Sequence, residues 1–242
     1  MRKHNLYWLT LLLCSILFSC GNTKNDNAQN SKSEIENTLL SHPILGIDVS
    51  HFQGTIDWQK IKAANIDFAY DKASQGQGYQ DPEYSHNRQG AKNVGLIHGA
   101  YHFYVAGENP EKQASNYLEA AEYTPGDMPP VLDLEPGGMK NTVDKKSFQQ
   151  NVLKWLTLVE EKLKVKPIIY TDPQFGNEYL DLPEFSKYPL WIAEYGVKNP
   201  KTPIAWKKNG WLIWQRTDKG KIQGAIGNVD HDLYNPEKNF FK

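Results

Sequence analysis

The chain has 242 residues, of which 39% are hydrophobic and 23% are charged, and its formal net charge at pH 7 is −1. This is an ordinary globular composition, and the length fits one large domain as well as two small ones. The sequence has no block of Lys and Arg residues of the kind that binds nucleic acid, so we expect no nucleic-acid partner.

The first twenty residues have the pattern of a secretory signal. Arg2 and Lys3 form a basic start, an apolar stretch follows from residue 6 to residue 18, and the small residue Ser19 precedes Cys20. The apolar stretch is too short for a comfortable membrane span. Its end, Leu-Phe-Ser-Cys, resembles the lipobox of bacterial lipoproteins, which implies a signal peptide over residues 1–20 and lipidation of Cys20. A plain signal peptide or an anchor is the alternative.

Two further regions follow the signal. Residues 21–41 are rich in Asn, Ser, Lys and Gln, which indicates a flexible tether. Residues 42–242 contain no low-complexity break or obvious repeat, and a stretch of about 200 residues suits one domain. Cys14 and Cys20 are the only cysteines of the chain, so this domain has no disulfide or thiolate chemistry. We expect a monomer, lipid-anchored in the cell envelope, and the lack of Asp directly after Cys20 favours the outer membrane or a periplasmic face.

Short apolar runs predict eight strands, near residues 44–49, 68–72, 96–104, 131–134, 167–170, 189–193, 211–215 and 229–233. Helices fit between the early strands. Asp57 can cap a helix through Ala64, and Asx-Pro pairs at 81–82 and 109–110 precede helices over 83–93 and 111–121. The clearest helix covers residues 148–163, where apolar residues recur at spacings of three and four, and Ser147 with Gln150 matches a capping box.

This order of elements predicts an irregular (β/α) barrel with eight strands and fewer than eight helices. Strand–helix alternation favours a parallel sheet, and eight strands permit closure. After Tyr170, prolines at 173, 183, 189, 200 and 203 break the chain, so we expect little helix there. An open doubly wound sheet is the competing arrangement, but residues 48–51, Asp-Val-Ser-His, stand where its Gly-rich loop would be.

A short acidic motif directly follows one apolar run. Asp133 and Glu135 are two positions apart, so on a strand their side chains point to the same side. Paired carboxylates at the mouth of a barrel are suited to general acid and charge-stabilising work on a glycosidic bond. The motif therefore favours a glycoside hydrolase.

Other strand ends also carry carboxylates. Asp48 follows the first apolar run, and Asp230 lies on the last predicted strand. In a (β/α) barrel the ends of the strands converge on one site, where these two would meet Asp133 and Glu135. A single Asp after a strand is more often a turn or cap residue, but its recurrence on several strands favours a functional site. His98 and His102 are consistent with core histidines.

Aromatic residues add a second signal. Trp191 and Tyr195 lie on one side of a predicted strand, together with Ala193. On the side of the barrel mouth such a pair would form a wall on which sugar rings stack. The alternative interpretation is that both rings belong to the hydrophobic core.

The chain resembles the family 25 glycoside hydrolases, the Chalaropsis-type lysozymes. The resemblance rests on segments that occur in the family's order and span nearly all of residues 44–234. The segments are 46–54, 68–76, 99–103, 130–135, 189–195, 214–215 and 227–230. The resemblance implies an irregular eight-stranded barrel that hydrolyses the β-1,4 bond between N-acetylmuramic acid and N-acetylglucosamine in peptidoglycan, with no cofactor and no metal.

The resemblance also implies roles for individual residues. Glu135 would be the general acid, with a pKa raised by like charges and burial. Asp133 would stabilise the developing positive charge or orient the 2-acetamido group of the substrate, and Asp48 and Asp230 would complete an acidic floor. The residues expected to line the sugar subsites are Tyr101, Trp191, Tyr195, Gln215, Gln53, Gln75 and Tyr170.

Two positions depart from the family pattern. Gln75 stands where the family usually has Glu, which removes one negative charge, and Asp71 stands where an apolar residue is usual. Two other functions stay open on the sequence. One is an inactive relative that binds peptidoglycan without cutting it. The other is a metal-dependent hydrolase or deacetylase, for which the available ligands are Asp48, His51, His98, His102, Asp230, His231 and Asp232.

Overall fold

The computed structural model describes residues 43–139 and 142–238. The predicted signal peptide, the tether and Cys20 lie outside the described residues. Among the helices of the described residues, none is both long and apolar enough to cross a membrane.

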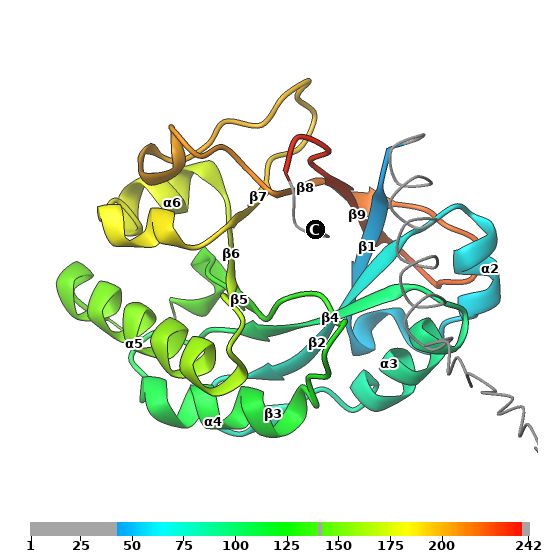
Figure 1. Ribbon diagram of the computed structural model, residues 1–242, viewed down its shortest axis with the longest axis horizontal. Helices are drawn as coiled ribbons and strands as arrows, with labels where there is room; N and C mark the ends of the chain where they lie inside the picture. The colour runs from blue at the N-terminus through cyan, green and yellow to red at the C-terminus, as the bar shows by residue number, and fades with distance from the viewer. Residues whose placement is uncertain (1–42, 140–141, 239–242) are drawn as a thin grey trace, which may run out of the picture. The chain divides into compact units, whose positions relative to one another are not determined.

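Eight strands form a closed ring (Figure 1). The sheet runs in the order β1, β9, β8, β7, β6, β5, β4, β2, and a further pairing of β1 with β2 closes it. These strands are β1 (Leu45–Val49), β2 (Phe68–Gln75), β4 (Ile97–Phe103), β5 (Val131–Asp133), β6 (Ile168–Thr171), β7 (Leu190–Ala193), β8 (Ile213–Gly220) and β9 (Val229–Tyr234). The short strand β3 (Tyr79–Gln80) extends β2 as a hairpin. The predicted irregular barrel is confirmed, and closure excludes the open doubly wound sheet.

The direction of the last strand is the irregular feature of the ring. All neighbouring pairs from β1 through β2 and on to β8 are parallel, whereas β9 runs antiparallel to both β8 and β1. The start of β9 therefore lies at the same rim as the ends of the other seven strands. Asp48, near the end of β1, pairs directly with Asp230, the second residue of β9.

The helices lie outside the ring (Figure 1). Within the described residues, five α-helices each follow one of the early strands. They are α2 (Trp58–Ala63), α3 (Tyr84–Asn93), α4 (Pro110–Ala120), α5 (Lys145–Leu163) and α6 (Pro173–Tyr179). Short 3-10 turns make up other connections, namely η1 (His51–Gln53), η2 (Pro136–Gly138), η3 (Pro183–Lys187) and η4 (Ile204–Trp206). The connections from β7 to β9 thus contain no α-helix in the part of the chain that the structure describes.

Helix starts follow side-chain capping. Asp57 and Asn109 cap α2 and α4 as predicted, each accepting a backbone N–H three residues on. The predicted capping box at Ser147 was wrong: α5 begins three residues earlier, and Asp144 accepts from the Ser147 backbone N–H. The sequence analysis expected little helix after Tyr170 and did not predict α6. Pro173 does not end a helix there, because it is the first residue of one. It occupies the first turn, directly after the capping Asp172.

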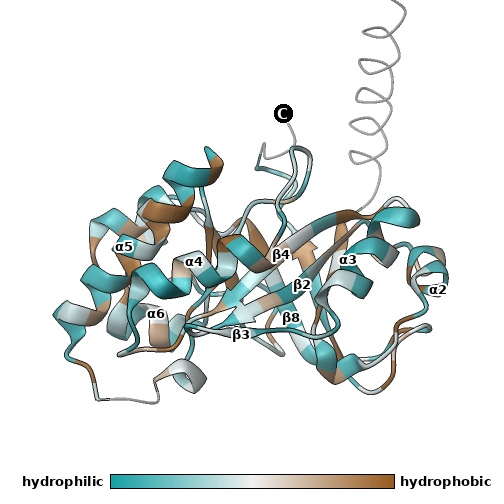
Figure 2. Cartoon of the chain, turned by 90° about the horizontal axis from the view of Figure 1, so that it is seen from below, coloured by the Kyte–Doolittle hydropathy of each residue, from teal (hydrophilic) through white to brown (hydrophobic). Residues whose placement is uncertain are grey.

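Two apolar layers join the helices to the outer face of the ring. One is centred on α5, where Val152, Trp155 and Leu156 are fully buried against Leu132 of β5 and its neighbours. The other joins α2 and α3 to β1 and β2. Figure 2 shows hydrophobic and hydrophilic residues alternating along α5, as expected of a helix with one face on a sheet. Each large side chain buried in this way contributes roughly 1.5–3 kcal/mol of transfer free energy.

Polar pairs are also enclosed in these layers, and they account for the histidines and for Asp71. His98 Nε2 lies 2.8 Å from Asp71 Oδ2, and both side chains are 1% exposed. His102 Nδ1 lies 2.8 Å from Ser74 Oγ, and its Nε2 lies 3.2 Å from Gln113 Oε1. The histidines are therefore hydrogen-bonded core residues. Asp71, unusual for the resembled family, is the buried partner of His98.

Candidate active site

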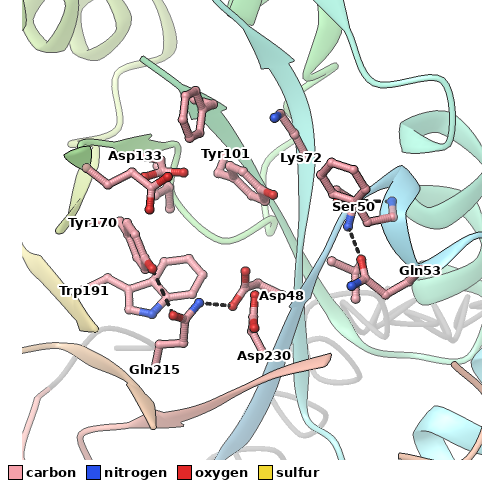
Figure 3. Close-up of a pocket in the computed structure, with 15 residues that line it drawn as sticks. Asp48, Ser50, Gln53, Lys72, Tyr101, Asp133, Tyr170, Trp191, Gln215 and Asp230 are labelled. Atoms are coloured by element: carbon pink, nitrogen blue, oxygen red, sulfur yellow. Dashed lines mark hydrogen bonds between the residues drawn. The ribbon is translucent and has the colours of Figure 1, made fainter. Parts of the chain in front are cut away.

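A cavity of about 220 Å³ opens at the rim where the parallel strands end (Figure 3). The four predicted carboxylates Asp48, Asp133, Glu135 and Asp230 all line it, although they are far apart in the sequence. The other lining residues are Val49, Ser50, Phe52, Gln53, Lys72, Tyr101, Phe103, Val131, Tyr170, Trp191 and Gln215. The barrel therefore brings the acidic residues and an aromatic wall to one place.

Strand geometry gives Asp133 and Glu135 a common direction. Val131, Asp133 and Glu135 alternate with Leu132 and Leu134, which are buried in the outer layer. The strand conformation continues past the last ladder residue, since Glu135 has φ −146° and ψ 167°. Pro136 then begins η2 and ends the extended segment. Both carboxyl groups thus face the cavity, as the motif predicted.

Burial and neighbouring negative charges raise the pKa of both carboxyl groups. Burial raises the pKa of Glu135 above its usual value, Asp172 raises it further, and Lys72 acts in the opposite direction. Burial also raises the pKa of Asp133, and the negative charge of Glu135 adds to the shift. Asp133 Oδ1 is shielded from solvent and has no hydrogen-bond partner within the described residues. The pair formed by Asp133 and Glu135 therefore gives up its protons at higher pH than isolated carboxyl groups do.

Asp48 and Asp230 form a second pair across the β1–β9 ladder. The pKa of Asp48 is raised well above its usual value by burial and by the charges of Asp230 and Asp232. Burial raises the pKa of Asp230 to about 6. Like charges this close cannot all be ionised without a large cost, so the group retains protons at pH values where isolated carboxylates have lost them.

Gln215 connects this pair to the aromatic wall (Figure 3). Its Nε2 donates to Asp48 Oδ2 at 2.7 Å. Its Oε1 accepts from the hydroxyl groups of Tyr170 at 2.9 Å and Tyr195 at 2.5 Å. Since two hydroxyl donors fix the amide oxygen, the amide nitrogen must point at Asp48. Gln215 is therefore a link that orients an acidic residue.

The remaining predicted subsite residues differ in their placement. Tyr101, Tyr170 and Trp191 line the cavity, whereas Tyr195 is 43% exposed and is connected to it through Gln215. Gln53 also lines the cavity, but its side chain closes the η1 turn: Oε1 accepts from the Ser50 backbone N–H, and Nε2 donates to the Asn228 carbonyl.

Gln75 is not a lining residue. Its Oε1 instead accepts from Lys72 Nζ at 2.7 Å. Lys72 lines the cavity, and the sequence analysis missed it. Its inward direction could have been predicted, because it lies two residues after Tyr70 on the same strand and Tyr70 points inward. Lys72 Nζ also lies over the Phe103 ring, 4.8 Å from its centroid.

Phe52 was missed as well. It is 80% exposed at the edge of the cavity, in the η1 turn, and no periodicity marks it as a surface aromatic.

Three of the histidines considered as metal ligands have other partners. His51 Nδ1 pairs with Asp81 at 2.7 Å, while His98 and His102 are hydrogen-bonded in the outer layer. Among the described residues, no three side chains of His, Cys, Asp and Glu are grouped so as to hold a metal ion.

Comparisons with known proteins agree with this geometry. The family model described as glycosyl hydrolases family 25 matches residues 47–225. Protein YegX of Escherichia coli K12 is 35% identical over 201 residues, which cover 81% of this chain and 71% of that protein. Lysozyme M1 of Streptomyces globisporus is 31% identical over 211 residues, which cover 79% and 68%. The crystal structure of the bacterial lysozyme from Streptomyces coelicolor matches with a TM-score of 0.75 at 30% identity and covers 81% of this chain and 93% of that chain.

The raised pKa of Asp230 predicts how the free energy of unfolding depends on pH. Between the usual value of 3.8 and about 6, the folded protein binds this proton more tightly than the unfolded chain does. Its contribution therefore lowers the free energy of unfolding as the pH rises through this window. Replacement of Asp230 by Asn should therefore reduce the decrease in the free energy of unfolding across this pH window. Urea denaturation at several pH values measures it.

The matched control is Asp181→Asn. The pKa of Asp181 is lowered by its hydrogen bond to Lys145, so its contribution is lost only on acidification below the usual range. This control should leave the slope within the window unchanged. An equal effect of both substitutions would contradict the assignment to Asp230.

Proposed function

The chain belongs to glycosyl hydrolases family 25, and we propose that it is a muramidase that cleaves the β-1,4 bond between N-acetylmuramic acid and N-acetylglucosamine in peptidoglycan. It is a glycoside hydrolase of the lysozyme type. The observation that carries the proposal is the pair Asp133 and Glu135, which point from one strand into a cavity with an aromatic wall.

Glu135 is suited to be the general acid. It is partly buried, and its raised pKa lets it keep a proton at a pH where most carboxyl groups are ionised. It transfers this proton to the glycosidic oxygen as the bond to the anomeric carbon breaks, so that the leaving sugar departs as an alcohol. Asp172, at the start of α6, is the charged neighbour that supports retention of the proton.

Asp133 is suited to act on the sugar whose bond breaks. Its side chain lines the cavity, so its carboxylate can accept a hydrogen bond from a substrate N–H. A 2-acetamido group held there would present its carbonyl oxygen to the anomeric carbon, and the negative charge would stabilise the cation that develops. Asp48 and Asp230 line the same cavity and extend its acidic floor.

The aromatic wall supplies binding. Tyr101, Tyr170 and Trp191 line the cavity beside the carboxyl groups, and the exposed ring of Phe52 lies at its edge. Sugar rings present apolar C–H faces that pack on such rings, while the polar groups between them fix orientation. This wall is consistent with a glycan strand running across the rim of the barrel.

Replacement of Glu135 by Gln tests the proposal directly. The amide keeps the size of the side chain but has no acidic proton, so we expect a loss of about 10³-fold in the rate of peptidoglycan digestion. The measurement is mass spectrometry of the products made by the full chain and by the variant. Only the unmutated protein should release muropeptides that end in reducing N-acetylmuramic acid. If neither protein releases fragments and both sediment with the sacculus, a non-catalytic binding function replaces the proposal.

Asp172→Asn is a finer test of the acid. Asn keeps the cap of α6 but removes the charge that raises the pKa of Glu135. The pKa of Glu135 should fall, so the basic limb of the kcat/KM profile should move to lower pH while activity at acidic pH stays near normal. Asp144→Asn, which changes the cap of α5 with the same loss of charge, serves as control and should not move the limb.

We also propose that the protein is a lipoprotein anchored through Cys20 and acts as a monomer on peptidoglycan in the cell envelope. The support is the Leu-Phe-Ser-Cys sequence after a basic and apolar leader, followed by a polar stretch. Cys20→Ser should abolish incorporation of labelled palmitate and shift the protein from the membrane fraction to the soluble one. Retention of label by the variant would contradict the assignment of the anchor.

A further inference from the structure

One carboxyl group at the centre of the barrel has no part in the reaction described above. Asp232 lies on β9, two residues after Asp230, so its side chain points to the same inner side. It pairs with Gly46 of β1, one step deeper than the pair formed by Asp48 and Asp230. Its side chain is completely buried, and it does not line the cavity. A substrate therefore does not reach it.

The two oxygens of Asp232 have different surroundings. Oδ1 accepts a hydrogen bond of 3.1 Å from Trp191 Nε1, the ring of which lines the cavity. Oδ2 has no donor within the described residues, and its acidic neighbour on β1 is Asp48, two residues from Gly46, with which Asp232 pairs. The other charged or titratable groups that face Asp232 are Asp230 from its own strand, Tyr70 from β2 and Arg216 from β8.

A proton shared between the carboxyl groups of Asp48 and Asp232 would give the unpaired Asp232 Oδ2 a hydrogen-bond donor. A buried carboxylate oxygen without a donor is costly, and two adjacent carboxylates cannot both be ionised at low cost. Gln215 Nε2 already donates to Asp48 Oδ2, so the proton belongs on the other oxygen of Asp48. Asp230 is the competing acceptor for that proton. However, Asp230 is partly exposed and can be solvated, whereas Asp232 cannot.

We propose that Asp232 is a positioning residue that shares one proton with Asp48 and accepts the Trp191 indole N–H, so that it fixes an acidic residue and a sugar-facing ring relative to each other. This inference rests on the proposed function for its catalytic consequence, but the shared proton does not depend on it. Asp232 acts through the two residues that touch the glycan, one from β1 and one from β7.

The direction of the titrations agrees with the geometry. Burial raises the pKa of both Asp48 and Asp232, and the charges of their acidic neighbours raise each further. A pair of this kind titrates as one unit and keeps a proton to higher pH than an isolated carboxylic acid does.

The test is the infrared C=O stretch of neutral carboxyl groups, recorded on the full chain in heavy water above the pKa of about 6 of Asp230. Asp232→Asn keeps the shape of the side chain and an acceptor for Trp191, but its amide N–H donates to Asp48. Asp48 should then be ionised, and the difference spectrum should show the loss of one neutral carboxyl group. Asp48→Asn should lose the same band, because either substitution removes the pair.

Two controls decide between explanations. Asp218→Asn removes an exposed carboxylate of β8 that also acts on Asp230, so it reproduces the change in charge without touching the pair. It should keep the band. Loss of the band in both Asp232→Asn and Asp218→Asn would overturn the proposal, because a general charge effect would then suffice. Retention in Asp232→Asn with loss in Asp230→Asn would overturn it in favour of a proton shared with Asp230.

Kinetics on peptidoglycan gives the second readout. For Asp232→Asn we expect kcat to fall by about tenfold or more with KM within about twofold, while Asp218→Asn stays within about twofold in both. A purely structural role would lower the melting temperature without changing kcat of the folded fraction, and that result would overturn the positioning role. Should the unmutated protein not digest peptidoglycan, the proposed function fails, but the infrared comparison still decides whether the proton is shared.

Discussion

The reversed direction of β9 is the constraint on which the site depends. A ring of parallel strands brings only strand ends to the rim that carries the cavity, whereas β9 lies antiparallel between β8 and β1 and brings its first residues there. Asp230 can therefore face Asp48 across a ladder instead of lying at the opposite end of the barrel. The same ladder places Asp232 one step below them, in the interior. Closure of the sheet and assembly of the acidic floor are thus one structural event.

Concentrating carboxyl groups in a barrel opposes the stability of the fold. The pKa values of Asp48, Asp133, Glu135 and Asp230 are all raised, with burial as the largest cause, so each carboxyl group would be easier to ionise in the unfolded chain. The apolar layers around α5 and α2 supply the opposing free energy, because they bury large side chains on the outer face of the same strands. Such strain is useful in a hydrolase, since a general acid must keep its proton at the working pH.

Polar groups are sorted by the side of the sheet on which they lie. On the outer side, His98, His102 and Asp71 are hydrogen-bonded to neighbouring side chains and do not line the cavity. On the inner side, hydrogen bonds form a path from Tyr195 and Tyr170 through Gln215 to Asp48. The outer pairs belong to the scaffold, whereas the inner path holds Asp48 in position at the cavity. Polar residues that all lie on or near predicted strands in the sequence therefore have different roles, depending on the side of the sheet that they face.

The sequence by itself determined the local parts of this protein. Apolar runs located the eight strands, Asp57 and Asn109 marked helix starts, and the two-residue spacing of Asp133 and Glu135 fixed their common side. These features depend on backbone periodicity and on contacts within a few residues. The start of α5 and the whole of α6 were missed because Asp144 and Asp172 are caps that compete with equally plausible neighbouring signals.

Only the tertiary structure decided which distant side chains meet. Strand polarity placed Asp230 opposite Asp48, and ring closure buried Asp232 against Trp191. The partners of Gln53 and Gln75 are local by contrast, since Ser50 and Lys72 are each three residues away, and Ser50 with Gln53 forms a capping box that the sequence analysis missed. The long-range contacts have no sequence signature, because their energies arise from burial and from partners as many as 167 residues apart, as in the hydrogen bond between Asp48 and Gln215.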